Sequence, residues 1–192
     1  MTLKDQIKQQ FSEATDVLKA FQTEENFEKI EQAVILMSKA LENGNKIISC
    51  GNGGSMCDAM HFAEELSGRF RNNRKGLAAV SISDPSHISC VANDYGYDFV
   101  FSRYLEALGQ PGDVLLGIST SGNSQNVILA VDKAKELEIS SIVLTGKDGG
   151  KLARLADLEI RAPHSTYADR AQEIHIKVIH NLILGIENKL GL

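Results

Sequence analysis

The stretch that decides the fold is Cys50-Gly51-Asn52-Gly53-Gly54-Ser55, which joins an apolar run at 46–49 to a helical pattern carrying His61 and Glu65. An apolar strand, a glycine-rich turn and a helix start together form an anion site. Glycine lets the backbone approach a ligand, and the first helical N–H groups have no partner within the helix. An imidazole and a carboxylate follow on the same helix. The stretch therefore predicts an enzyme that acts on a small phosphorylated substrate.

The order strand, loop, helix repeats outward from this stretch. We expect strands at 45–50, 77–82, 114–118, 141–145 and 157–161. Helices are expected at 3–22, 26–43, from the glycine turn to about 68, 86–93, 98–109, 124–137 and 167–189, with a short one before the last strand. This order predicts an α/β fold of one domain, 1–192: a three-layer sandwich with a five-stranded parallel sheet, flavodoxin-like, with 1–43 as a helical extension. Ligands bind at the carboxyl ends of such strands, where loops 51–55 and 119–124 fall.

Two helices carry more apolar surface than a single small domain needs. The helix at 3–22 has a narrow apolar stripe, made of Leu3, Ile7, Phe11, Ala14, Leu18 and Phe21. Such a stripe is typical of a helix-packing seam, either within one subunit or between subunits. The helix at 167–189 is apolar around most of its circumference. We expect its extra face, and the extension, to pack in an oligomer.

The bulk composition excludes several classes of protein. The chain has 192 residues and a formal net charge of −5, which disfavours nucleic acid as a partner. No secretory leader and no apolar run of membrane-spanning length is visible, so a cytoplasmic protein is expected. Cys50, Cys57 and Cys90 give an odd count without a metal-binding spacing, and reduced thiols are the simple interpretation.

The second polar loop, Ser119-Thr120-Ser121-Gly122-Asn123-Ser124, strengthens the prediction of phosphate binding. The glycine stretch is neither a P-loop, since the Lys-Ser/Thr ending is absent, nor a dinucleotide fingerprint, since the third glycine is misplaced. Hydroxyls and backbone N–H groups can hold a phosphate without lysine. Helix capping by Ser124 or Asn123 is the alternative, and it is compatible with ligand binding.

The two loops together resemble the sugar isomerase (SIS) domain. Further motifs are similar to one family within it, the bacterial phosphoheptose isomerases: His61-Phe62-Ala63-Glu64-Glu65-Leu66, Ala92-Asn93-Asp94, Leu144-Thr145-Gly146-Lys147-Asp148-Gly149-Gly150 and Gln172-Glu173-Ile174-His175 through His180. The resemblance runs from the N-terminal helices to the last helix. It implies conversion of sedoheptulose 7-phosphate into D-glycero-D-manno-heptose 7-phosphate, the first step towards the heptose of the lipopolysaccharide core.

The resemblance also implies a site and an assembly. The implied substrate-binding residues are Asn52, Gly53, Gly54, Ser55, Glu65, Asn93, Asp94, Ser119, Thr120, Ser121, Ser124 and Gln172. The implied ligands of one zinc ion per subunit are His61, Glu65, Gln172 and His180. The family is cytoplasmic and forms homotetramers with active sites shared between subunits.

Helical geometry permits this ligand set. His61 and Glu65 are four residues apart and share one face of a helix, and Gln172 and His180 lie on one side of the last helix. Nitrogen and oxygen donors suit zinc, although glutamine is a less usual ligand. His175 either reaches the site or packs in the core, and His87 and His164 are expected near turns. Groups expected to orient the ligands are Arg69, Asp169 and Glu173.

The chemistry implied is ketose–aldose isomerisation through an enediol, with Glu65 as the base and His180 as the partner acid. A carboxylate bound to zinc is a weaker base, so Glu65 either moves off the metal during turnover or serves mainly as a ligand. Two other functions are weighed against the enzyme: a non-catalytic SIS protein that binds a replication initiator, and a sensor of sugar phosphates. The first lacks an acid at the position of Glu65 and an imidazole at that of His180; the second needs no acid–base pair.

Overall fold

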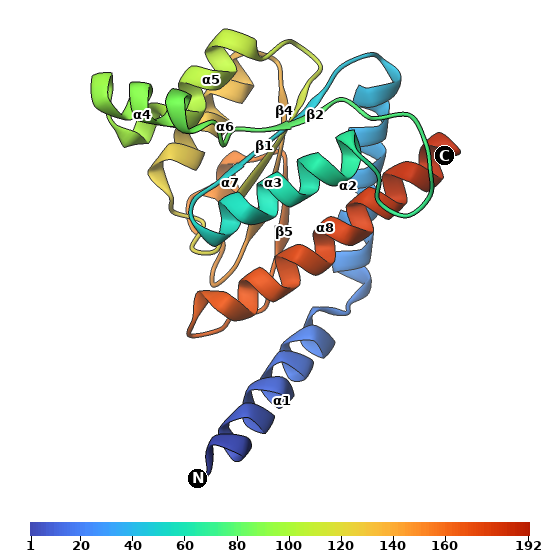
Figure 1. Ribbon diagram of the computed structural model, residues 1–192, viewed down its shortest axis with the longest axis vertical. Coiled ribbons are helices and arrows are strands. Elements are labelled where there is room, and N and C mark those ends of the chain that lie inside the picture. The colour runs from blue at the N-terminus through green and yellow to red at the C-terminus, as the bar shows by residue number, and fades with distance from the viewer.

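The computed structural model describes residues 1–192 and contains one sheet of five parallel strands (Figure 1). The strands are β1 Ile47–Gly51, β2 Ala79–Ser81, β3 Val114–Ser119, β4 Ser140–Thr145 and β5 Leu158–Arg161, in the spatial order β2-β1-β3-β4-β5. The predicted α/β class with five parallel strands is confirmed. Because the order reverses between β1 and β3, the carboxyl ends of these two strands form the topological switch point at which ligands bind in sheets of this kind.

Helices cover both faces of the sheet. They are α1 Leu3–Phe21, α2 Glu24–Glu42, α3 Gly54–Ser67, α4 Pro85–Asp94, the 3-10 helix η1 Tyr97–Phe99, α5 Val100–Leu108, α6 Gln125–Glu136, α7 Leu152–Leu155 and α8 Ala168–Leu190. The predicted boundaries agree closely. The second strand is shorter than expected, and a 3-10 turn opens the helix expected at 98–109.

Two hydrophobic cores lie on opposite faces of the sheet because strand side chains alternate. Leu116 and Ile118 of β3 point to the core made with α2, α3 and α8. Leu115, between them in the pleat, points to the core made with α4, α5, α6 and α7. Every residue of β3 is buried, which explains its continuous apolar sequence.

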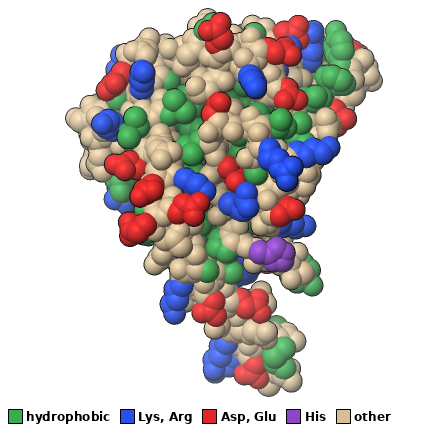
Figure 2. All heavy atoms as spheres, turned by 180° about the vertical axis from the view of Figure 1, so that it is seen from behind, with side chains coloured by type: hydrophobic (Ala, Val, Ile, Leu, Met, Phe, Trp, Pro, Cys, Tyr) green, Lys and Arg blue, Asp and Glu red, His purple; other side chains and the backbone are tan.

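Helix α1 projects from the body of the molecule (Figure 1), and Figure 2 shows the same projection from behind. Phe21, at its end, is buried and Leu18 packs partly against the core. The first half of the apolar stripe is bare: Leu3 is 72% exposed, Ile7 is 50% exposed and Phe11 is 74% exposed. The seam predicted from the sequence therefore has no partner within the single chain along its first half.

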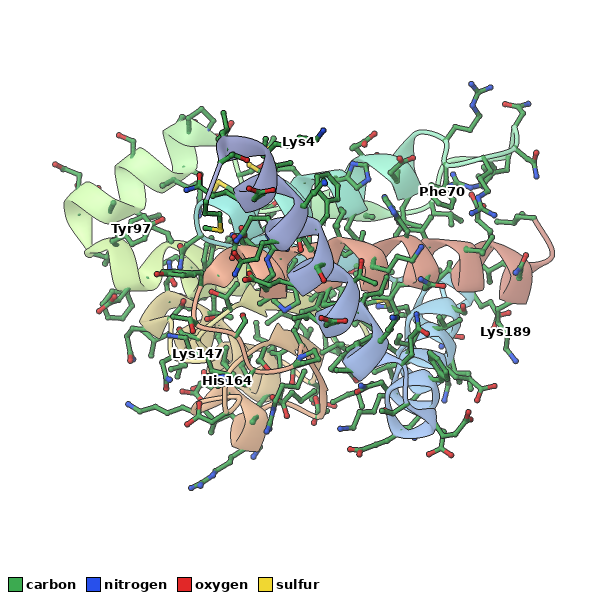
Figure 3. All side chains as sticks on the ribbon, turned by 90° about the horizontal axis from the view of Figure 1, so that it is seen from below. Lys4, Phe70, Tyr97, Lys147, His164 and Lys189 are labelled. Atoms are coloured by element: carbon green, nitrogen blue, oxygen red, sulfur yellow. The ribbon has the colours of Figure 1, made fainter.

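Helices α3 and α8 pack side by side and run in the same direction, as Figures 1 and 3 show from two sides. Beyond the end of α3, Arg74 joins the pair: its guanidinium lies 2.8 Å from the Glu187 carboxylate of α8, and both side chains are buried. Arg74 also donates to the backbone carbonyl oxygens of Glu65 and Leu66. These carbonyls lie in the last turn of α3, so the cation caps the helix and ties it to α8.

None of the helices combines the length and the apolar character that a membrane crossing requires.

Candidate active site

The glycine loop between β1 and α3 gives the site its first wall. Gly53 is the N-cap residue of α3 and has φ of +55°, a left-handed conformation that glycine adopts without strain. A methyl group at Gly54 would overlap the side-chain amide of Gln172 from α8. The structure therefore places Gln172 directly against the loop. Asn52 is half-buried, Gly53 and Gly54 are exposed, and the loop is open to a ligand at these glycines.

Asn52 is held by two residues that sequence analysis missed. Its side-chain amide exchanges two hydrogen bonds, of 2.9 and 2.8 Å, with the amide of Asn126 in the first turn of α6. The Tyr97 hydroxyl donates to Asn52 Oδ1 at 3.0 Å. Asn126 is buried, and an amide on the otherwise apolar buried face of α6 was the available signal. No local signal pointed to Tyr97.

The serine loop after β3 gives the site its second wall. Ser119 Oγ and Ser124 Oγ lie 2.9 Å apart. Ser124 occupies the N-cap position of α6, as expected, but its side chain makes no capping hydrogen bond. Asn123 does not cap the helix either, since its amide donates to Ser121 O and accepts from the backbone N–H of Lys151. The hydroxyls of Ser119 and Ser124 are thus directed to each other at the loop.

Asn93 and Asp94 lie at the end of α4 and are exposed. The Asn93 amide donates to Asp94 Oδ1 at 2.8 Å. The next turn, η1, carries Tyr97, whose hydroxyl reaches Asn52. Asn93 and Asp94 themselves make no hydrogen bond to the glycine loop.

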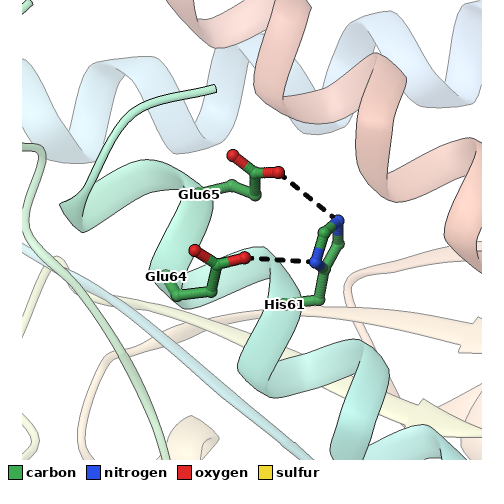
Figure 4. A group of neighbouring side chains, drawn as sticks. All are labelled: His61, Glu64 and Glu65. Carbon is green, nitrogen blue, oxygen red and sulfur yellow. Dashed lines mark ion pairs between the residues drawn. The ribbon is translucent and has the colours of Figure 1, made fainter. Parts of the chain in front are cut away.

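The chemical centre of the site is a group of side chains from α3 and α8. His61 Nε2 lies 3.0 Å from His180 Nε2 and 3.6 Å from Glu65 Oε1. The two imidazole rings meet edge to face, with centroids 5.2 Å apart. Figure 4 shows that Glu64 approaches the other ring nitrogen of His61, Nδ1, at 3.2 Å. Sequence analysis quoted Glu64 within a motif but gave it no role.

The structure brings together three of the four predicted metal ligands, His61, Glu65 and His180. It places the fourth, Gln172, at Gly54, seven residues before His61 on α3. Seven residues correspond to roughly 10 Å along a helix axis. In this structure Gln172 is placed among the predicted substrate-binding residues, and it would reach the histidines only by moving its side chain.

Burial sets the electrostatics of the neighbouring groups. Burial, followed by the charge of His61, lowers the pKa of His180, so its imidazole is neutral near neutral pH. Burial raises the pKa of Asp58, one turn before His61, to about 6. Asp58 Oδ2 is buried and has no hydrogen-bond partner. Sequence analysis missed Asp58, although its spacing of three residues from His61 places it on the same side of α3.

The other predicted neighbours lie outside the site. His175 is buried in the core, where its Nε2 lies 2.8 Å from Thr145 O and burial lowers its pKa to about 4, so the packing alternative is correct. Asp169 and Glu173 both pair with Arg170 and not with a ligand. Arg69 is exposed just beyond α3.

His87 Nε2 lies 2.9 Å from the carbonyl oxygen of Val100, in the interior of the second helical layer. His164 is exposed in the segment before α8. Neither hydrogen-bonds to or stacks on the cluster on α3 and α8.

The donor set at the chemical centre fits zinc. Two imidazole nitrogens and one carboxylate oxygen converge from two helices, and these are donor types that zinc prefers. Catalytic zinc sites commonly use three protein ligands and leave a position open for substrate. Glu64 approaches the opposite nitrogen of His61, although one ligand atom from each of His61, Glu64 and Glu65 lies within 4.8 Å of the others.

Comparisons with known proteins agree on one family. A family model described as the SIS domain matches residues 9–146. A relative from Tolumonas auensis, named phosphoheptose isomerase, is 62% identical over 186 residues, which is 96% of this chain and 97% of the relative.

Two solved structures are similar over almost the whole chain. The phosphoheptose isomerase from Neisseria gonorrhoeae matches with a TM-score of 0.91 and 43% identity, covering 97% of this chain and all of that chain. The one from Francisella tularensis matches with a TM-score of 0.93 and 36% identity, covering 98% of this chain and all of that chain.

Proposed function

We propose that Glu65 and His180 carry out catalysis in this chain. The chain belongs to the SIS domain family and, within it, to the phosphoheptose isomerases. It is an isomerase that converts sedoheptulose 7-phosphate into D-glycero-D-manno-heptose 7-phosphate, the step that opens the route to the heptose of the lipopolysaccharide core. The observation that carries the residue assignment is the convergence of Glu65 and His180 on one nitrogen of His61.

The substrate's phosphate binds at the serine loop. The hydroxyls of Ser119 and Ser124 already face each other, and Ser121 and Thr120 add two more beside them. The start of α6 contributes backbone N–H groups and the positive end of its dipole. The sugar hydroxyls then lie against the glycine-loop side of the site. Amide and carboxylate groups suit them there: Asn52, Asn93, Asp94 and Gln172, with the backbone of 53–55.

Glu65 and His180 perform the proton transfers. Glu65 removes a proton from C1 of the ketose, and the His180 N–H donates to the C2 carbonyl oxygen, which gives the enediol. Return of the proton to C2, with loss of the proton from the C1 hydroxyl, gives the aldose. A neutral imidazole suits the acid role, because it can give a proton to one oxygen and accept one from the other. The low pKa of His180 keeps it in that form.

His61, Glu65 and His180 would hold a zinc ion, and Gln172 would complete the set only if its amide leaves Gly54. When bound, zinc polarises the carbonyl and hydroxyl oxygens and stabilises negative charge on the enediolate. Glu65 is half-buried and is held by no hydrogen bond of its side chain, which supports a carboxylate that can turn between ligand and base.

The proposal includes a homotetramer with shared active sites. The bare apolar half of α1 supports it, as does a hollow of about 620 Å³ between α1, α2 and α8 that includes Leu18, Phe21 and Phe27 in its lining. Apolar surface of this kind is normally covered by a partner. The proposal places the protein in the cytoplasm, and three unpaired cysteines suit a reducing compartment.

The test is NMR observation of purified protein with sedoheptulose 7-phosphate in D₂O. The enzyme should consume the ketose and place deuterium at C2 of the product. Removal of metal by chelation should reduce turnover, and added zinc should restore it. A sensor or a replication-associated binding protein would leave the ketose unchanged. If turnover proceeds normally after complete chelation, the zinc part of the proposal is wrong.

A further inference from the structure

His61 lies between two carboxylates of the following turn of its own helix. Glu64 Oε1 is 3.2 Å from His61 Nδ1, and Glu65 Oε1 is 3.6 Å from Nε2 (Figure 4). The two ring nitrogens point in different directions, so the carboxylates act on opposite sides of the imidazole. We propose that Glu64 is a positioning residue that fixes the tautomer of His61, with the proton on Nδ1 and the lone pair on Nε2.

The chemistry of the donors supports this assignment. An ionised carboxylate only accepts hydrogen bonds, so Nδ1 must carry the proton for the Glu64 contact to form. Nε2 of a neutral His61 then has only a lone pair, and His180 Nε2, at 3.0 Å, must donate its own proton to it. A single direction of donation follows, from His180 to His61 and from His61 to Glu64.

This inference rests on the proposed function for its consequence. A histidine binds a metal ion through a lone pair, and metal-bound histidines usually donate the other ring N–H to a carboxylate or carbonyl. Glu64 therefore prepares His61 as a ligand before any ion arrives. His180 must move its proton from Nε2 to Nδ1 before its Nε2 can bind the same ion. His61 therefore has the tautomer that binds metal from the start, whereas His180 has to change its tautomer.

The first test needs neither metal nor activity. Long-range ¹H–¹⁵N correlation spectra of the metal-free, ¹⁵N-labelled protein at about pH 8, above the ordinary imidazole pKa of roughly 6.5, report which nitrogen carries each proton. We expect Nδ1–H for His61 and Nε2–H for His180. Glu64→Ala should shift His61 towards Nε2–H. Glu64→Gln should restore the Nδ1–H form, because its amide oxygen still accepts.

Glu136→Ala is the matched control. The Glu136 side chain is as exposed as that of Glu64, and it pairs with Lys133 on α6, another helix. The substitution should leave both histidines unchanged. A wild-type His61 with its proton on Nε2, or an unchanged His61 in Glu64→Ala, would overturn the assignment.

The second test is zinc titration against a chromophoric chelator. Glu64→Ala should weaken zinc binding on the order of 10- to 100-fold, the usual loss when such an orienting partner is removed, and Glu64→Gln should recover most of it. Equal affinity in wild type and Glu64→Ala would contradict the positioning role. Absence of zinc binding in the wild type would instead contradict the proposed metal site, and the tautomer result would still stand.

Discussion

The two ends of the α3–α8 pair use different chemical groups. At the glycine-loop end, the backbone of Gly54 lies against the side-chain amide of Gln172. The ligand-facing groups there are the backbone of Gly53, which has a positive φ, and the first N–H groups of α3. At the histidine end, His61 and His180 meet through side chains alone. The comparison teaches that binding groups can be fixed by backbone conformation, whereas catalytic groups depend on how two helices pack.

The largest expected effect lies at the histidine end. Glu65→Gln should lower kcat by on the order of 1,000-fold, because the amide that replaces the carboxylate cannot take the C1 proton in the transition state and is a weaker metal ligand. Steady-state kinetics with sedoheptulose 7-phosphate measure this. Glu136→Gln, at an exposed glutamate that pairs with Lys133, is the control and should keep the activity. If kcat of Glu65→Gln is within tenfold of the wild-type value, the histidine end is not the catalytic end of the site.

The next largest effect is the pH dependence of stability that comes from His175, on the same helix as His180. The folded state holds His175 neutral, with its pKa lowered to about 4 from 6.5, so folding is favoured fully above about pH 6.5 and loses this contribution as the pH falls towards 4. The loss amounts to about 3 kcal/mol. Urea unfolding from pH 7 to pH 4, with an NMR titration of the imidazoles, measures it. A His175 signal that titrates near 6.5 would show that its burial has no electrostatic cost.

A smaller effect is expected at the glycine-loop end. Gly54→Ala should raise KM about tenfold and leave kcat nearly unchanged, because the new methyl group displaces the Gln172 amide from the loop. In a double-mutant cycle, adding Gly54→Ala to Gln172→Ala should cause little further loss. If Gly54→Ala lowers kcat as strongly as Glu65→Gln does, the two ends are not separate in function.

The smallest effect concerns Asp58, between the two ends. Its pKa is raised to about 6, so ionisation costs stability above that pH and nothing below about pH 4, where it is protonated in both states. Asp58→Asn should therefore stabilise the chelated protein by about 1 kcal/mol at pH 8, a figure reduced for its partial exposure to solvent. Thermal unfolding at pH 8 and pH 4 measures the difference. An equal gain at both values would exclude ionisation as the cause.

Much of the fold follows from local sequence. The apolar run at 114–118 predicts a strand buried on both faces, and β3 is such a strand. The spacing of His61 and Glu65 predicts a shared helix face, and both side chains lie within reach of each other. The contacts of Tyr97 and Asn126 with Asn52 were not predictable, because they span 45 and 74 residues of the chain, even though Asn126 stands out as an amide among apolar residues.

Local residue patterns specify the glycine and serine loops, the alternation of strands and helices along the chain, and the apolar faces of the helices, because backbone geometry sets these periods locally. Tertiary packing places His180 against His61 and Gln172 against Gly54. It also leaves Glu64 near Nδ1 of His61 and Glu65 near Nε2. Such choices depend on the direction and register with which α8 packs on α3. Burial of apolar surface over the whole core sets that register, and the six residues themselves do not.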